Sequence, residues 1–488
     1  MEKKSLGVNF IFNALKTLMG VVFPLITFPY ATRIVGPEAL GKIDYAQTNV
    51  TYFTLIAVFG ISGYAVREGA RIRDDKEKIS KFAGEILAIN LVTVSVAYVL
   101  FFLALLIPKF APYRGLMLIF STTIILTAVG LEWLYNIYED YKYITIRSFV
   151  FQVISMILLF TCVKDEGDYV IYALILICSS VGSNIMNIIR SRKYIKLRVV
   201  FNSNFWVHLK PMFLIFIMNI AASIYLVMDR SMLGFITGSD REVGLYGAAI
   251  KITTIITSLM NTVRVVMTPR VSFSVQNDEK QAEKLNYIAV RLVSMLSVPC
   301  AIGLFFLSER VLVFFAGSEY RESSLALQIL LMDVVFAAIN GVVINQIFMS
   351  YRRDKSASAA VILGAVVNLI LNAITIPLYG KEGAAFSTLI SEMAIFVFAC
   401  IVGREFFKVG KIIKQICQSI FACIPMVGIY FVLVYLGLHD VLVIFGTIII
   451  GAIFYFVVLF LIKNELINQG YSYIKETYRK KRMHRGSM

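Results

Sequence analysis

Residues 441 to 462 read VLVIFGTIIIGAIFYFVVLFLI, a run of 22 residues without a charged side chain. About 20 apolar residues form a helix that is long enough to cross the hydrocarbon core of a bilayer. The whole chain has this character, because 58% of its 488 residues are hydrophobic and only 16% are charged. Soluble domains average roughly 45 to 50% apolar and about 25% charged residues. The sequence therefore predicts an all-α polytopic membrane protein.

Similar apolar runs recur along the chain and leave no room for a sizeable soluble domain. We predict about 14 transmembrane helices, at residues 7–32, 41–65, 82–107, 114–137, 144–163, 168–189, 211–237, 243–268, 286–307, 323–349, 356–378, 382–403, 415–437 and 440–462. A long basic connection around Arg190 to Lys210 separates six spans from the next six, as at the seam of a duplicated transporter. The expected parts are a six-helix bundle in 1–200, a second in 201–410, and two additional helices with a basic tail in 411–488.

A short sequence echo fits this duplication. Gly36–Gly41 (GPEALG) joins spans 1 and 2 and is followed by Tyr45-Ala46. Gly238–Gly244 (GSDREVG) joins spans 7 and 8 and is followed by Tyr246-Gly247-Ala248. Turn chemistry favours glycine and charged residues at any tight hairpin, so the echo alone does not establish the duplication.

The basic residues indicate the orientation of the chain. Its formal net charge is +16, which in a soluble protein would suggest nucleic-acid binding. With both termini placed in the cytoplasm, 34 of the 47 Lys and Arg residues fall in inside segments, 9 fall in outside loops, and four lie within spans. This bias is the positive-inside pattern of membrane proteins. We therefore expect a multi-pass protein with cytoplasmic termini and no nucleic-acid partner.

The cysteines, the histidines and one aromatic cluster show no pattern of a metal or catalytic site. The six cysteines lie in or beside apolar runs and have no metal-ligand spacing, so we interpret them as packing residues. The three histidines are scattered near span ends, and we expect neither a metal site, nor a cofactor, nor catalytic residues. The aromatic cluster of Trp133, Tyr135, Tyr138, Tyr141 and Tyr143 lies at an inside boundary and is typical of an interfacial belt.

The four cations within predicted spans lie on polar stripes at helical spacing. Charged side chains at this depth cost about 2.5 to 3.5 kcal/mol, so they usually face a protein interior or a water-filled cavity. We predict a substrate-binding set of cavity cations and stripe residues: Lys16, Arg230, Lys251, Arg264, Asn13, Asn261 and Gln47. The alternative is structural, because Asn, Ser and Thr also bond neighbouring helices and Arg230 and Arg264 can snorkel.

Two carboxylates lie near the predicted middle of the bilayer. Asp333 and Glu392 are each about 10 residues into a span, which at 1.5 Å per residue is roughly 15 Å deep. Each is either a packing partner for a buried cation or a coupling acid that binds a proton or a cation. Both interpretations stay open at this point.

Several separated motifs resemble one family of transporters. They are Phe23–Arg33 with Gly36–Glu38 and Gly41, Arg67–Glu68 with Arg73–Lys78, Glu132–Tyr135, Tyr141–Ser148, Asp229–Gly234 and Gly383–Glu392. These stretches, in this order over about 400 residues, resemble bacterial oligosaccharide flippases of the polysaccharide transporter family. The resemblance implies the multidrug/oligosaccharidyl-lipid/polysaccharide exporter fold, with two six-helix bundles around a central cavity.

The resemblance also implies a function. Its members move undecaprenyl-diphosphate-linked oligosaccharides from the inner to the outer leaflet of the bacterial cell membrane by alternating access, for O-antigen, capsule or exopolysaccharide synthesis. The implied partners are the lipid-linked oligosaccharide, membrane lipids and polysaccharide polymerase machinery. Independently, Lys and Arg in a hydrated cavity can pair with diphosphate oxygens.

Three other functions are alternatives for a chain of this kind. A drug or metabolite exporter of the same fold is the main alternative, but a pump for organic cations should favour carboxylates on its stripes. A polysaccharide polymerase or glycosyltransferase needs a substantial outside loop, and the longest outside connection here has only some 15 residues, 308–322. A non-transporting scaffold would not need charges at mid-bilayer.

Overall fold

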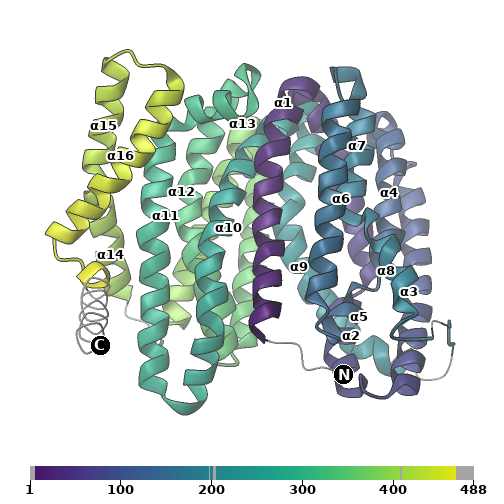
Figure 1. The fold of residues 1–488 in the computed structure, drawn as a ribbon. Helices are drawn as coiled ribbons and strands as arrows, with labels where there is room; N and C mark the ends of the chain where they lie inside the picture. The colour runs from purple at the N-terminus through teal and green to yellow at the C-terminus, as the bar shows by residue number, and fades with distance from the viewer. Residues whose placement is uncertain (1–5, 197, 202–204, 407–408, 469–488) are drawn as a thin grey trace, which may run out of the picture. The chain divides into compact units, whose positions relative to one another are not determined.

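The computed structural model describes residues 6–196, 198–201, 205–406 and 409–468. In these ranges the chain is helical and contains no strand (Figure 1). It divides into two compact units, Met1–Gly247 and Ala248–Met488. The all-α polytopic fold is as predicted, whereas the proposed division at residues 200 and 410 stays a prediction.

Unit 1 is built around its first helix, which packs against α3, α4, α6 and α9. Its longer helices run alongside one another (Figure 1). The elements are α1 (Leu6–Val58), α2 (Ile61–Ile72), α3 (Lys76–Ala104), η1 (Pro108–Tyr113), α4 (Arg114–Ala128), α5 (Glu132–Ile137), α6 (Tyr141–Cys162), η2 (Glu166–Asp168), α7 (Tyr169–Ile177), η3 (Cys178–Gly182), α8 (Asn184–Ser191) and α9 (Phe205–Thr237). Helix α10 (Asp240–Asn277) begins in this unit and continues in the second.

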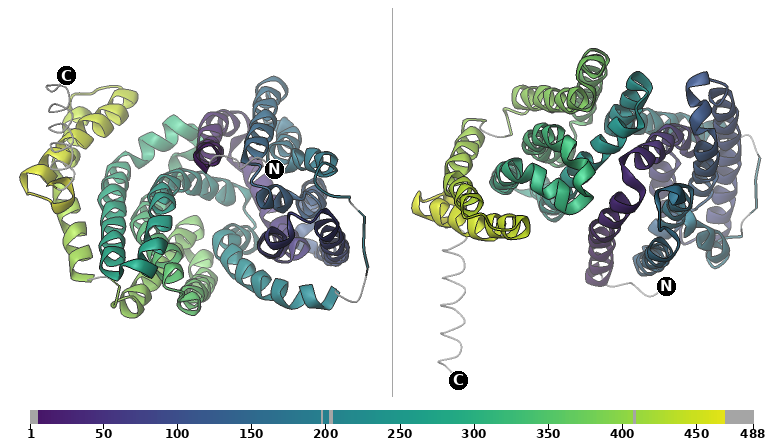
Figure 2. Two further views of the ribbon diagram at one scale, coloured as in Figure 1. Left: turned by 60° about the horizontal axis from the view of Figure 1, so that its bottom comes forward. Right: turned by 90° about the horizontal axis from the view of Figure 1, so that it is seen from above.

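Unit 2 continues with two long helices that pack side by side, α11 and α12. Three further helices, α14 to α16, contact α11 and lie beside it in Figure 2. The elements are α11 (Glu279–Ala316), η4 (Ser318–Ser323), α12 (Ser324–Val342), η5 (Val343–Phe348), α13 (Asp354–Val402), α14 (Val409–Ala422), α15 (Ile424–Tyr435) and α16 (Asp440–Leu461).

The number of membrane crossings follows from the helices and their breaks. In the described residues, 11 helical segments are long and apolar enough to cross a membrane. Two of them are interrupted by a glycine with a positive φ, Gly36 (φ 76°) in α1 and Gly380 (φ 53°) in α13, so each supplies two crossings. Helix α9 adds a shorter apolar stretch, Trp206–Ile217. This count is consistent with about 14 crossings.

The aromatic cluster of unit 1 corrects one prediction. Trp133, Tyr135 and Tyr138 are only 4%, 0% and 7% exposed, and they form a core with Tyr64 and Phe82. The Tyr135 hydroxyl donates to a backbone carbonyl of α8, and that of Tyr138 donates to a carbonyl at the end of α2. These rings therefore join α2, α3, α5 and α8 instead of forming an interfacial belt.

A buried polar network attaches the C-terminal helices to α11. Arg291 of α11 is 4% exposed, and its Nε and Nη2 donate to Oε1 of Gln415 on α14 at 3.1 and 3.0 Å. Its Nη1 donates to Glu465, just beyond α16. Asn464 Nδ2 donates to the same Gln415 oxygen at 3.1 Å. The Arg291 guanidinium group thus links α11 to α14 and to the segment that follows α16.

Candidate functional site

The two hairpins that echo each other in sequence meet in unit 1. A Cβ atom at Gly41 would lie 1.7 Å from the carbonyl oxygen of Asp240, and one at Gly244 would lie 1.9 Å from that of Pro37. Only glycine permits this approach of α1 to the start of α10. Gly41 and Gly244 therefore have a packing role. Their contact fixes the position of the following residues of α1 and α10 along the helix axes.

An ion pair lies one turn beyond this contact. Asp44 of α1 and Arg230 of α9 approach to 3.9 Å between Oδ2 and Nη1, and their side chains are 30% and 26% exposed. A Cβ at Gly247 would lie 2.5 Å from the same Asp44 oxygen, so the carboxylate occupies space that a side chain would fill. Because the pair is loose and partly solvated, Arg230 is held weakly and can exchange partners.

Further polar contacts connect these helices. Ser231 Oγ donates to Oδ1 of Asn49 at 3.3 Å, and the Tyr246 hydroxyl donates to Oδ2 of the buried Asp229 at 2.9 Å. Asp44 and Asn49 were outside the predicted binding set. Asp44 lies three residues before Gln47 in the sequence, a helical spacing that indicates a shared face, but the sequence does not show that Asp44 faces Arg230.

Three predicted residues lie on α1. The side chains of Asn13 and Lys16 lie outside what the structure describes, although α1 includes both positions. Gln47 is half-buried and lies on the part of α1 that follows the break at Gly36. Its backbone carbonyl accepts the hydroxyl of Thr51 at 2.9 Å, so that hydroxyl has its donor satisfied within the helix.

The longest line of polar residues at helical spacing lies along the part of α10 in unit 2. It consists of Lys251, Thr254, Ser258, Asn261 and Arg264. Lys251 and Arg264 are half-buried and Asn261 is exposed, whereas Ile252 and Ile256 between them are buried. The stripe therefore occupies a face of α10 that its own unit leaves partly uncovered. The Nε atom of Arg264 is buried and has no hydrogen-bond partner among the described residues. A guanidinium in this state can bind an anion.

The hydroxyl groups of the stripe are already partly satisfied. Thr254 Oγ1 donates to the carbonyl of Ile250 and Ser258 Oγ donates to that of Thr254, both at 2.7 Å. Their oxygens still have lone pairs that can accept a hydrogen bond. These groups can therefore accept from sugar hydroxyls without losing their bonds to the helix.

Both predicted coupling acids are buried in unit 2. Asp333 on α12 is 9% exposed and Glu392 on α13 is 8% exposed. Asn340 Nδ2 donates to Oε2 of Glu392 at 2.6 Å and to its backbone carbonyl at 2.9 Å. Asn340 lies seven residues after Asp333 on α12, which is two turns or about 10 Å. Sequence reasoning missed Asn340, because an uncharged amide in an apolar run carries little signal.

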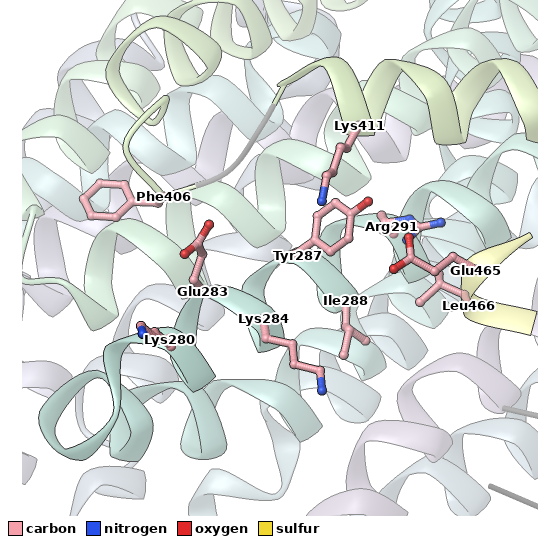
Figure 3. A pocket seen from close by; sticks show the side chains of 10 residues that line it. All are labelled: Lys280, Glu283, Lys284, Tyr287, Ile288, Arg291, Phe406, Lys411, Glu465 and Leu466. Atoms are coloured by element: carbon pink, nitrogen blue, oxygen red, sulfur yellow. The ribbon is translucent and has the colours of Figure 1, made fainter. Parts of the chain in front are cut away.

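A polar pocket of about 270 Å³ opens beside the Arg291 network (Figure 3). Lys280 and Lys284 of α11 and Lys411 of α14 line it, and the Tyr287 ring lies 4.8 Å from Lys411 Nζ and 4.9 Å from Arg291 Cζ. None of the predicted substrate-binding residues lines this pocket. Arg291 and Glu465, which line it, are the residues that link α11 to α14 and to the segment after α16.

Comparison with known proteins identifies the family. The profile described as "Polysaccharide biosynthesis protein" matches residues 6–275, which is more than half of the chain. The chain belongs to this family. A second profile, MatE, matches residues 215–374. The family match includes all four cations of the predicted binding set.

Named relatives agree with this membership. The chain is 27% identical over 382 residues to a "Putative O-antigen transporter" of Shigella dysenteriae, covering 77% of this chain and 94% of the relative. It is 22% identical over 397 residues to a protein of the same name from Escherichia coli K12, covering 81% and 95%. A "Probable low-salt glycan biosynthesis flippase" of Haloferax volcanii is 29% identical over 36% of each chain.

Solved structures share the fold. The "Lipid II flippase MurJ, inward closed conformation" superposes with a TM-score of 0.77 at 18% identity, covering 94% of this chain and 100% of that chain. An inward-facing multidrug resistance MATE family transporter gives a TM-score of 0.60 at 13% identity, covering 83% and 98%. These likenesses show that the chain shares the fold of both proteins.

Proposed function

We propose that this protein is a flippase that moves undecaprenyl-diphosphate-linked oligosaccharide repeat units from the inner to the outer leaflet, for the synthesis of a surface polysaccharide. The observation that carries the proposal is the family match over residues 6–275, the range that contains Lys16, Arg230, Lys251 and Arg264. The relatives of Shigella and Escherichia coli named "Putative O-antigen transporter", which are similar to this chain over most of their length, support the substrate class.

The cations supply the chemistry that such a substrate needs. A diphosphate cannot cross the hydrocarbon core unpaired, because even one unpaired charge costs several kcal/mol there. Among the described residues, Arg230 has a loose pair with Asp44, and Arg264 has a buried Nε without a hydrogen-bond partner. Both guanidinium groups can form charge-assisted bonds to phosphate oxygens. Lys16 and Lys251 would add cations at other depths.

Transport would proceed by alternating access. The sugars would enter a hydrated cavity, where Asn13, Gln47 and Asn261 bond their hydroxyls, while the prenyl tail stays in lipid. Asp333 and Glu392 would couple the cycle to an ion gradient. We place the protein in the bacterial inner membrane with both termini in the cytoplasm, close to a polysaccharide polymerase that consumes its product. The activity proposed is transport, without an enzymatic step.

The same fold also occurs in drug exporters. The MatE profile covers about a third of the chain, and the MATE transporters are under 25% identical to it, so they support the fold and not that activity. The partly uncovered stripe of α10 carries Lys251 and Arg264, which suit an anionic substrate. We therefore favour the lipid-linked oligosaccharide.

Reconstitution tests the proposal directly. The purified protein is inserted into proteoliposomes with a fluorescent undecaprenyl-diphosphate oligosaccharide, and an impermeant quencher added outside reports the leaflet occupied by the label. Faster transfer than in protein-free vesicles is the expected result. Transfer at the protein-free rate, together with active uptake of an organic cation such as ethidium by the same preparation, would identify a drug exporter instead.

A further inference from the structure

A basic pocket lies in unit 1, between the first turns of α3 and the segment that follows α8, of which residues 192–196 and 198–201 are described. It has a volume of about 550 Å³. Six cationic side chains and one acidic side chain line it: Lys76, Lys81, Arg192, Lys193, Lys196, Arg198 and Glu77. Like charges gathered in one cleft repel one another, so this lining favours a bound anion.

Backbone contacts hold the segment against α3. The Lys196 N–H donates to Ser80 Oγ at 3.1 Å, and the Val200 N–H donates to the carbonyl of Gly84 at 3.2 Å. A Cβ at Gly84 would lie 2.2 Å from the carbonyl oxygen of Arg198. The pocket is therefore a built feature of the fold, whereas an excess of basic residues at the cytoplasmic side requires no defined geometry.

The acid that directly precedes α3, Asp75, already has hydrogen-bond and ion-pair partners. Asp75 caps α3, since its Oδ1 accepts the backbone N–H groups of Glu77 and Lys78 at 3.1 Å. Its Oδ2 pairs with Lys78 Nζ at 3.1 Å. The backbone hydrogen bond from Lys78, followed by the side-chain hydrogen bond from the same residue, lowers the pKa of Asp75. This carboxylate is thus committed to the helix terminus and to a cation outside the pocket.

A second acid, Asp140, is hydrogen-bonded to Tyr194, which lines the pocket, and also has a cationic partner. Asp140 Oδ2 accepts the hydroxyl of Tyr194 at 2.8 Å and Nη2 of Arg190 at 3.2 Å. Burial, followed by the hydrogen bond to Asp140, raises the pKa of Tyr194 to about 12, so its hydroxyl stays neutral. Within the described ranges, no ion pair joins any of the six pocket cations to an acid.

Apolar side chains adjoin the cations. Val199 and Phe201, at the end of the same segment, are 45% and 68% exposed. Basic residues next to exposed apolar ones are typical of segments at a membrane surface. We propose that this pocket binds the phosphate group of an anionic phospholipid at the cytoplasmic surface. The inference rests on the orientation given under the proposed function, and not on the transported substrate.

A tryptophan reporter beside the pocket tests this inference. Val199→Trp is introduced together with Trp206→Phe, which removes the exposed native tryptophan and leaves only the buried Trp133. The full chain is reconstituted in phosphatidylcholine vesicles containing an equal fraction of brominated phosphatidylglycerol or brominated phosphatidylcholine. Bromine quenches tryptophan on contact. We expect association with phosphatidylglycerol to be favoured by about fivefold or more, the effect of one basic residue at a membrane surface.

Two triple variants, each lacking three cations, distinguish binding in the pocket from a general effect of surface charge. Arg192→Gln, Lys196→Gln and Arg198→Gln together should remove the preference for phosphatidylglycerol. The control carries Lys280→Gln, Lys284→Gln and Lys411→Gln in the pocket of Figure 3, which changes the net charge equally, and it should keep the preference.

The competing outcomes are distinct. No preference in the parent, or equal loss in both triple variants, would overturn the proposal. Inorganic phosphate added at constant ionic strength distinguishes the two sources of the ligand. If millimolar phosphate abolishes the preference, the pocket binds a soluble anion and the lipid assignment is wrong. Because transport is not read out, these results are independent of the flippase activity.

Discussion

Gly41 and Gly244 lie in backbone contact, and a Cβ atom on Gly41 would stand 2.9 Å from the backbone nitrogen of Gly244. Each glycine closes one of the two hairpins that echo each other in the sequence. The contact sets the approach of α1 to α10, and the ion pair of Asp44 and Arg230 lies one turn further along. Packing at these glycines therefore positions a proposed substrate-binding cation.

Gly41→Ala and Gly244→Ala should each destabilise the protein. A methyl group at either position would overlap a backbone carbonyl, which cannot rotate away as a side chain can. Overpacking of this kind costs about 1 to 3 kcal/mol. Gly115→Ala on α4 is the control, because a Cβ there meets nothing within 4 Å. Thermal unfolding in detergent should show lower midpoints for the first two variants only; unchanged midpoints would refute the close contact.

Much of the fold could be predicted from the sequence, because hydropathy and basic residues report membrane crossings locally. The glycine echo located both hairpins. Side-chain neighbours could not be predicted, because the pairing of Asp44 with Arg230 depends on helices that are distant in the chain. The prediction of an interfacial belt at Trp133 was wrong for a related reason. Composition does not distinguish an aromatic ring that faces lipid from one that is buried in a core between short helices.

Topology is tested by single cysteines in a chain whose six native cysteines are replaced. Cysteines at Ser239 and Ser318, in predicted outside loops, should react with an impermeant thiol reagent added to intact cells. A cysteine at the exposed Asn277, the last residue of α10, should react only after the membrane is opened. The reverse pattern would invert the proposed orientation.

The attachment of the C-terminal helices should depend on Arg291. Arg291→Met removes the donors that bond Gln415 and Glu465, and we expect a loss of about 1 to 3 kcal/mol in stability, since the side chain of Glu465 is 56% exposed and can be hydrated. Arg353→Met, which breaks an exposed pair with Glu405, should cost about 0 to 1 kcal/mol. Equal unfolding midpoints for the two variants would show that the buried network contributes nothing beyond a surface pair.

Ion coupling is tested by amides at the two buried acids. Glu392→Gln retains an oxygen that can accept from Asn340, so the fold should tolerate it while the titratable group is lost. Asp333→Asn is the parallel change on α12. If either acid binds the coupling ion, its amide variant should lose gradient-dependent transport at normal membrane abundance. Persistence of gradient dependence in both variants would remove these acids from the mechanism.

The cavity cations carry the central claim. The pair of Arg230 with Asp44 is loose and partly solvated, so Arg230→Gln should change stability by only about 0 to 1 kcal/mol. Arg310 provides a matched control, because its side chain is also 26% exposed and pairs with Asp440 at 3.2 Å. A role in holding the diphosphate predicts loss of transport from Arg230→Gln and not from Arg310→Gln.

The most direct measurement is export of the lipid-linked oligosaccharide, with membrane abundance determined in parallel, for glutamine variants at Lys16, Arg230 and Lys251. Each is compared with the opposite basic residue at the same position. We predict that the glutamine variants lose export at normal abundance and that Lys251→Arg, like the matching basic variants at the other two positions, retains much of it. A fall in abundance with Lys251→Gln would mark a structural ion pair, which costs about 3 to 5 kcal/mol to break when buried. Normal export from the glutamine variants at normal abundance would contradict the cationic cavity.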